Sequence, residues 1–400
     1  MKNFVLLMLC FFIIGAGQLL SLDLLLYRLI PVSYFLAIFF LFYIKPPSID
    51  EFKVLAFSLL FFLPVYLYLI LSSSWSVIPD EAFRNAIYTL ISVLPAFIFG
   101  FVLKRRYSLE SIASGVVLFV MLVLLQAIYN YYHYSHFMII DKAIMRTVVA
   151  SIVILFSPIV LGMFLIKKNI IYLSGFIVLL FLLLSSESRS SVLITIPAVF
   201  IVLYLYNRML ALKSVLVFSG IFLAAVFIFN LKLPERFIHT NVNVSASVID
   251  DLTKSASEHA DIARRLITYV SLQLFKEKPV LGAGYSSVWQ TNLKKYGQNF
   301  SAHGLVPGTL SEIGILGMSL FLLIIFRVIY IFRKLIQNNN KSSIFLIKSF
   351  FIGFISLCGF GLFHQLLETV YFALIVGIFM GFSVTKSANI EGAINNPVNQ

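Results

Sequence analysis

The sequence predicts an all-α integral membrane protein with about twelve transmembrane helices and one large loop that contains helices of its own. The first observation is composition: 60% of the 400 residues are hydrophobic and 12% are charged, whereas soluble domains carry about 25% charged residues. The second is length, because apolar runs close to the roughly 20 residues that cross a bilayer recur along the chain. Lipid must solvate such a chain, so soluble protein classes are excluded.

Twelve apolar runs qualify as membrane spans or come close. Pro64, Pro95, Pro158 and Pro197 fall inside them, and neighbouring helices of a bundle can satisfy the carbonyl groups that these prolines leave free. The first run has a single lysine before it and no small-residue cleavage site after it, so we interpret it as a helix and not as a signal peptide. The twelve runs are residues 4–22, 26–44, 53–72, 86–103, 111–130, 147–166, 169–185, 191–207, 213–230, 307–332, 343–363 and 367–385.

The lysines and arginines of the connections predict that both termini are cytoplasmic. With a cytoplasmic amino terminus, sixteen of the 30 basic residues fall on the cytoplasmic side and five in short loops on the opposite side. Basic residues concentrate in cytoplasmic loops, so this distribution fits an even number of spans. The net charge of +13 is therefore mostly a topology signal, and we expect the lipid bilayer, not nucleic acid, as the partner.

The spans and connections divide the chain into four parts. Residues 1–230 hold spans one to nine, 231–306 form a large outer loop, 307–386 hold spans ten to twelve, and 387–400 form a cytoplasmic tail. The outer loop has the composition of a soluble protein, and long loops with their own secondary structure are usually functional.

A helix is predicted from Asp261 to Lys278 inside the outer loop. Asp261 is a suitable N-cap, and Pro279 stops the helix. Its apolar residues share one face, so we expect it to lie along the bilayer surface or to pack on top of the bundle. A turn at 282–284 and a second helix over 285–296 follow. The apolar stripe consists of Ile262, Leu266, Tyr269, Val270 and Phe275.

Two groups of arginines are predicted close to the outer membrane surface. The connection Ser185–Ser191 surrounds Arg189 with serines, and hydroxyl groups beside a planar guanidinium suit phosphate oxygens. The alternative is an interfacial arginine in a polar turn. Arg264 and Arg265 are neighbours on the amphipathic helix and point about 100° apart, so we do not expect both to face one ligand; alternatively they touch lipid head groups.

His303 and Glu312 are further candidates, at the start of the tenth span. A histidine titrates near neutral pH and can accept a proton from a hydroxyl group, although a histidine at a membrane interface can equally be structural. Glu312 falls inside the predicted span, where an unpaired carboxylate is costly. We expect it to pair with an arginine, either as a catalytic helper or as a brace.

No metal site or cofactor is expected from the sequence. Cys10 and Cys358 both lie inside apolar runs, and no spacing of His, Cys or Asp residues is typical of a metal site. No glycine-rich phosphate loop is found.

Three blocks of sequence together resemble the O-antigen ligase/polymerase superfamily of bacterial envelope glycosyltransferases. Residues 183–191 are similar to a serine–arginine turn of that family. The family's arginine block is similar to a second stretch, which consists of Arg265, an aromatic residue four positions later and the Pro-x-x-Gly-x-Gly run over 279–284. Residues 301–305 with 312–317 are similar to its histidine block. The chain departs from the family pattern at Gly304, where a polar residue is frequent, and at Tyr269, where tryptophan is usual.

The resemblance implies a GT-C-like bundle in the bacterial inner membrane, with its active site on the periplasmic side. It implies a ligase that transfers O-antigen polysaccharide from undecaprenyl diphosphate to the lipid A–core oligosaccharide. Arginines that hold the diphosphate would make the transfer metal-independent, and direct in-line attack would invert the anomeric centre. The implied site residues are His303 as catalytic base; Arg189, Arg265 and Arg264 for diphosphate binding; and Ser188, Tyr269 and Glu312 in supporting roles.

Two other functions remain open at this point. A polymerase of the same superfamily would share every site residue, although the single large outer loop favours a ligase. A flippase or transporter of lipid-linked sugar would also be a twelve-helix bundle. It should carry charged residues near the middle of the membrane, whereas here the charges concentrate at one face and in one loop.

Overall fold

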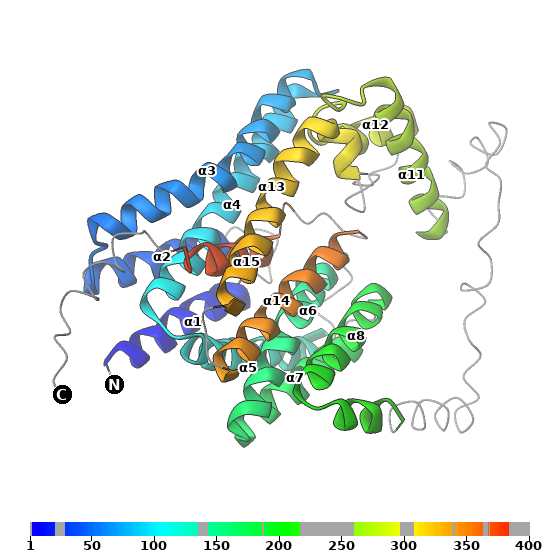
Figure 1. Ribbon diagram of the computed structural model, residues 1–400. Helices are drawn as coiled ribbons and strands as arrows, with labels where there is room; N and C mark the ends of the chain where they lie inside the picture. The colour runs from blue at the N-terminus through cyan, green and yellow to red at the C-terminus, as the bar shows by residue number, and fades with distance from the viewer. Residues whose placement is uncertain are drawn as a thin grey trace.

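Helices make up all of the regular structure in the computed structural model, which describes residues 2–20, 29–134, 143–185, 188–216, 260–296, 308–337, 341–362, 367 and 369–383 (Figure 1). No strand occurs in these ranges, so the predicted all-α fold is confirmed. The helices are α1 (Lys2–Leu20), α2 (Leu29–Ile44), α3 (Ile49–Ser72), the short 3-10 helix η2 (Ser73–Trp75), α4 (Pro79–Arg106), α5 (Leu109–Tyr134), α6 (Ala143–Lys167), α7 (Ile170–Ser185), α8 (Arg189–Tyr206), α11 (Ala260–Glu277), α12 (Ser287–Tyr296), α13 (Leu310–Gln337), α14 (Lys341–Gly361) and α15 (Val370–Met380).

Eleven of the twelve predicted spans coincide with a helix of the described chain. Five stretches are long and apolar enough to cross a membrane, and α1, α2, α5, α7, α8 and α15 contain shorter apolar segments. The ninth predicted span, 213–230, lies outside the described residues except for the end of a helix over 208–216. The structure is thus that of a helical membrane protein, and the number twelve stays a prediction. The five stretches are Ile49–Trp75, Pro79–Arg106, Val148–Lys167, Leu310–Gln337 and Lys341–Gly361.

Helix α15 is buried in the bundle against α4. Every residue from Tyr371 to Met380 is buried. At Gly100 an added Cβ would lie 2.2 Å from the Leu374 carbonyl oxygen, and at Gly377 it would lie 2.1 Å from the Phe97 carbonyl oxygen. Small residues thus let the two helix backbones approach closely, as at many membrane helix interfaces. The sequence predicted a full span over 367–385, but the helix is shorter and its neighbours are protein side chains.

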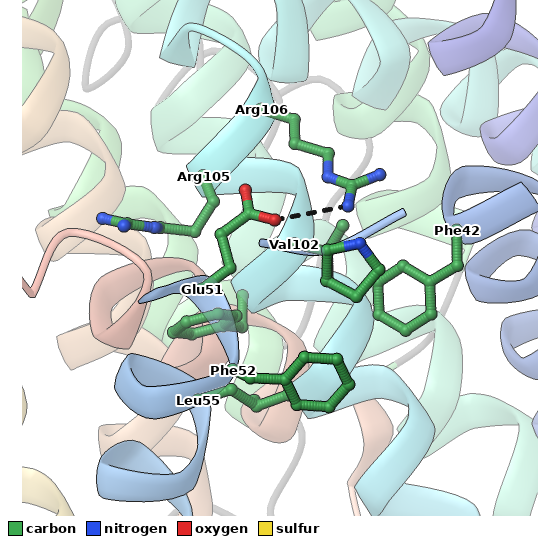
Figure 2. Close-up of a pocket in the computed structure, with 9 residues that line it drawn as sticks. Phe42, Glu51, Phe52, Leu55, Val102, Arg105 and Arg106 are labelled. Carbon is green, nitrogen blue, oxygen red and sulfur yellow. Dashed lines mark hydrogen bonds and ion pairs between the residues drawn. The ribbon is translucent and has the colours of Figure 1, made fainter. Parts of the chain in front are cut away.

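One end of the bundle is held by basic side chains. The Arg106 guanidinium is 3.4 Å from the Glu51 carboxylate and also donates to the Leu41 carbonyl oxygen at 2.6 Å. Arg105 donates to the Ser383 carbonyl oxygen at 3.3 Å, and Lys167 pairs with Glu110 at 2.7 Å. Figure 2 shows the Arg106–Glu51 pair beside the ring of Phe42, in a small pocket whose walls are mostly apolar. We call this the basic end.

The opposite end of the bundle gathers the connection between α3 and α4, the loop before α12 and the start of α13. Figure 1 shows α11 and α12 beside the amino-terminal end of α13. The Tyr68 hydroxyl on α3 donates to the Leu281 carbonyl oxygen at 2.8 Å, which ties these connections together. The predicted alternation of spans put the α3–α4 connection and the outer loop on the same side of the membrane. In the structure these two segments are in contact.

Candidate active site

The serine–arginine turn forms the start of α8. Ser188 is the N-cap: its hydroxyl accepts a hydrogen bond from the Ser191 backbone N–H, and the Ser191 hydroxyl donates to the Ser188 carbonyl oxygen at 2.7 Å. Arg189 is the first residue of the helix, where unpaired backbone N–H groups give the helix end a partial positive charge. The backbone here therefore favours an anion; the side chain of Arg189 lies outside the description.

Helix α11 is the amphipathic helix that the sequence predicted from Asp261 to Lys278. Leu266, Ile267 and Val270 are buried together with Val288 of α12, and Tyr269 packs against this cluster. The helix also contacts α13, so of the two predicted positions it takes the one on top of the bundle. The predicted stripe did not include Ile267. This residue is buried because α11 packs against two helices, α12 and α13, and so buries a wider face than the stripe.

The loop after α11 is joined to α13 by an exchange of backbone hydrogen bonds. Ala283 N–H donates to the Ser311 carbonyl oxygen at 2.8 Å, and Gly284 N–H donates to that of Glu312 at 2.9 Å. In return, Ile315 N–H donates to Pro279 at 2.9 Å, and Leu316 N–H donates to Val280 at 3.1 Å. We call these four bonds, between 279–284 and 311–316, the joint.

The joint replaces helical hydrogen bonds that α13 lacks. Gly314 has φ 64° and ψ −171°, so α13 is broken there. The sequence predicted one uninterrupted span over 307–332, and that prediction is wrong in its first turns. In a helix, Ser311 and Glu312 would accept from Ile315 and Leu316; instead both donors and both acceptors bond to the loop. Irregular backbone inside a membrane protein requires such internal partners.

Glycines are required at the joint by their backbone angles and by close contact. Gly282 has φ 75° and Gly314 has φ 64°, in the left-handed region that favours glycine. A Cβ at Gly282 would lie 2.3 Å from the Glu312 carbonyl oxygen, and one at Gly314 would lie 2.3 Å from that of Val280. The turn predicted at 282–284 is confirmed, and the joint unites the Pro-x-x-Gly-x-Gly run with the Glu312–Gly317 block.

Glu312 is buried at the joint, with 3% of its surface exposed. Its carboxylate accepts a hydrogen bond from the Val288 backbone N–H at 3.3 Å, in the first turn of α12. A carboxylate at a helix amino terminus stabilises the helix dipole. The sequence analysis left open whether Glu312 is structural or catalytic. This contact with α12 fits a structural role, and a catalytic role stays a prediction.

Side chains of the α3–α4 connection form hydrogen bonds with the residues that follow the joint, at the start of α12. The Ser76 hydroxyl is within hydrogen-bond distance of the Tyr285 carbonyl oxygen (2.8 Å), the Ser287 hydroxyl (3.1 Å) and the Gln290 Oε1 (2.7 Å). The Gln290 amide bonds both backbone groups of Ile78, at 2.7 and 3.0 Å. Sequence reasoning missed Ser76 and Gln290, because no sequence pattern links residues 214 positions apart.

Trp75 and Tyr285 complete this contact. The Trp75 indole N–H donates to the Gly282 carbonyl oxygen at 3.2 Å. The hydroxyl groups of Thr89 and Tyr285 lie 3.0 Å apart. An added Cβ at Gly284 would lie 2.7 Å from the Ser76 Cα, so here the two backbones touch.

The predicted site residues are only partly covered by the described structure. Tyr269 and Glu312 belong to the elements around α12 and the joint. Ser188 caps α8, which packs against α6, α7 and α14. Arg264 and Arg265 lie on α11, but their side chains are outside the description, and His303 lies wholly outside it. Their predicted convergence on one cavity is therefore not tested.

Comparison with known families gives one match. Residues 174–322 match the model of the family described as O-antigen ligase. The matched segment contains all seven predicted site residues and both halves of the joint. No curated protein matches the chain significantly.

Proposed function

We propose, for a chain whose residues 174–322 belong to the O-antigen ligase superfamily, that it transfers O-antigen polysaccharide from undecaprenyl diphosphate to the lipid A–core oligosaccharide. The transfer would take place at the periplasmic face of the bacterial inner membrane. The observation that carries the proposal is the family match, because the matched segment contains every residue that we expect in the site.

The joint supports a role for the matched segment as one structural unit. Four backbone hydrogen bonds connect the loop that follows α11 with the start of α13. Arg264 and Arg265 lie on α11, and His303 lies in the segment just before α13. The joint holds the loop after α11 against the start of α13, the two segments that flank the candidate residues in the sequence, and catalysis depends on fixed geometry.

The start of α8 is suited to the diphosphate of the donor. Ser188 caps the helix and Arg189 is its first residue. A helix amino terminus binds anions through free N–H groups, and a guanidinium adds a charged, two-pronged donor. We assign Arg189 to the diphosphate for this reason.

The family resemblance distinguishes the two arginines of α11. Arg265 precedes the aromatic residue Tyr269 by four positions, which is the spacing of the family's arginine block. Neighbouring positions point about 100° apart on a helix, so Arg264 points elsewhere. We therefore assign Arg265 to the donor diphosphate and use Arg264 as the comparison.

The reaction that these residues would carry is a direct displacement. A hydroxyl oxygen of the acceptor sugar attacks the anomeric carbon of the donor as the bond from that carbon to the diphosphate oxygen breaks. His303 accepts the hydroxyl proton, and undecaprenyl diphosphate leaves with the bonding electron pair. The arginines stabilise the charge that develops on the leaving group, which is electrostatic transition-state stabilisation. In-line attack inverts the anomeric centre.

The test is transfer by the purified protein in lipid vesicles that contain donor and acceptor, with the product measured by mass spectrometry. Arg265→Ala should lower the rate about 10²–10³-fold, and Arg264→Ala is the matched control with the same loss of charge. His303→Ala should lower it about 10²–10⁴-fold even at saturating donor. Equal activity of the two arginine variants would contradict the assignment of Arg265.

Metal independence is a separate expectation. Because fixed guanidinium groups neutralise the diphosphate in this mechanism, transfer should continue at the same rate in excess chelator. Activity that disappears with chelator and returns with Mg²⁺ would contradict it.

Ligase and polymerase predict different products in cells that lack the protein. Loss of a ligase leaves long polymer on the carrier lipid, whereas loss of a polymerase leaves single repeat units attached to the core. Mass analysis of lipopolysaccharide from a deletion strain, with and without the restored protein, distinguishes them.

A further inference from the structure

Arg327 lies on α13 among three aromatic rings, far along the chain from the joint. Its guanidinium carbon is 5.3 Å from the centre of the Phe57 ring and 4.9 Å from that of Phe61, both on α3. It is 5.4 Å from the ring of Tyr330, one turn later on α13. We call these four residues the Arg327 site. Cation–π contacts of this kind stabilise the charge of a guanidinium, but a ring face does not replace a hydrogen-bond acceptor for its N–H groups.

The guanidinium lacks a polar partner in the described part of the chain. Its buried Nε has no hydrogen-bond partner there, and no described residue forms an ion pair with it. An arginine carries five N–H donors and is always charged, and this one lies within an apolar stretch that can cross a membrane. A charged group in that position is costly unless an acceptor satisfies it, so the acceptor must come from outside these residues.

The Arg327 site lies close to the charged level of the basic end. Arg327 precedes Arg333 by six residues, about 9 Å along the helix, and Phe57 follows Lys53 by four, about 6 Å. This is within reach of a long side chain that extends toward lipid head groups. The surrounding surface is open and apolar, as expected for residues that face lipid. Its exposed side chains are Phe57 (46%), Leu60 (70%), Phe326 (62%) and Tyr330 (56%).

We propose that the Arg327 site binds the phosphate of an anionic phospholipid from the leaflet at the carboxyl end of α13. The guanidinium supplies the donors, the rings of Phe57 and Phe61 lie beside it, and the acyl chains lie on the exposed apolar side chains of α3 and α13. Lys53, Arg333 and Lys334 are exposed at the adjoining head-group level and favour a negatively charged head group. The proposal concerns the end opposite the joint and is independent of the glycosyltransferase activity.

The test is native mass spectrometry of the full-length protein in mild detergent. The two probes are phosphatidylglycerol and a diacylglycerol with the same acyl chains, which lacks the phosphate. Wild-type protein should retain phosphatidylglycerol about tenfold more tightly than Arg327→Gln does, the difference expected for one charge-assisted hydrogen-bonding site. Diacylglycerol should be retained equally by both.

Arg208→Gln is the matched control, because Arg208 is also an arginine over a ring (Tyr204, 5.4 Å) but is exposed, two residues after the end of α8. It should keep wild-type retention, and Arg327→Lys should keep most of it. Equal phosphatidylglycerol retention by wild type and Arg327→Gln would overturn the proposal. Equal retention of phosphatidylglycerol and diacylglycerol by the wild-type protein would also overturn it, because the apolar surface alone would then hold the lipid.

Discussion

The two ends of the bundle are held together in different ways. At the basic end, side chains such as Arg106 and Lys167 connect neighbouring helices through ion pairs. At the joint, backbone groups of 279–284 and 311–316 bond to each other directly. A side-chain contact can be replaced by another, but a backbone contact depends on the absence of side-chain atoms. We therefore expect the joint to be the more sensitive of the two ends.

A single methyl group at the joint should have the largest effect. In Gly314→Ala, the new Cβ would meet the Val280 carbonyl oxygen at a residue with positive φ. The expected loss of stability is about 3 kcal/mol or more, from strain and from the disrupted joint. Thermal unfolding of the purified protein measures it. Gly359→Ala is the control, because nothing described lies within 4 Å of a Cβ there; equal midpoints for the two variants would contradict the comparison.

Loss of the Gln290 amide should come next. Gln290→Leu removes three hydrogen bonds and leaves the part-buried Ile78 N–H without this partner. The Ile78 carbonyl oxygen still accepts from the Ala82 N–H, and the Ser76 hydroxyl keeps the Tyr285 carbonyl oxygen. A lost hydrogen bond costs about 0.5–1.5 kcal/mol and an unsatisfied group about 1–3 kcal/mol. We expect a stability loss of about 2–3 kcal/mol in total, measured as above. Gln273→Leu, on the exposed side of α11, should change little.

Breaking the buried ion pair at the basic end should have a smaller effect. Glu51→Gln keeps the shape of the side chain but removes the charge beside Arg106, whose side chain is 5% exposed. Removal of one partner of a fully buried pair costs about 3–5 kcal/mol. Here the glutamine oxygen can still accept from Arg106, and the Leu41 carbonyl oxygen also does, so we expect a smaller loss of about 1–2 kcal/mol, that of a hydrogen bond to a charged group. A loss larger than that of Gln290→Leu would reverse our ranking of the two ends.

Loss of the exposed pair between Lys167 and Glu110 should have the smallest effect. Both side chains are about half exposed, and surface ion pairs contribute little because water and salt screen them. Lys167→Gln should leave the unfolding midpoint unchanged at moderate salt. A clear drop would show that the basic end depends on more than its buried pair.

The membrane helices could be predicted because each is an apolar run, and α11 could be predicted from its apolar stripe and from Pro279, which follows its end. The start of α8 at Arg189 lies two residues before the predicted span. The break at Gly314 could not be predicted, because the run over 307–332 is apolar enough on average to be a continuous span, and a glycine alone does not show where a helix breaks. The Ser311 carbonyl oxygen accepts from the Ala283 N–H, 28 residues earlier in the chain, and a hydropathy pattern does not predict such a bond.

The candidate site was predictable to a similar extent. Glu312 stood out because a carboxylate is rare in a span, and the structure gives it a contact with the start of α12. Ser76 in the α3–α4 connection and Gln290 on α12 are ordinary polar residues, and only the tertiary fold brings them together. The roles of Arg189, Arg265 and His303 rest on the family resemblance and on the experiments proposed above.

Helix α4 connects the two ends of the bundle. It is 28 residues long, about 42 Å. Ile78, the residue before its first turn, bonds Gln290 near the joint, and Arg105 in its last turn donates to the Ser383 carbonyl oxygen. Between these contacts, Gly100 and Gly377 let α4 and α15 approach without intervening side chains. We therefore expect a displacement at one end of the bundle to reach the other through α4, unless the helix bends at Pro95, which interrupts its hydrogen bonds.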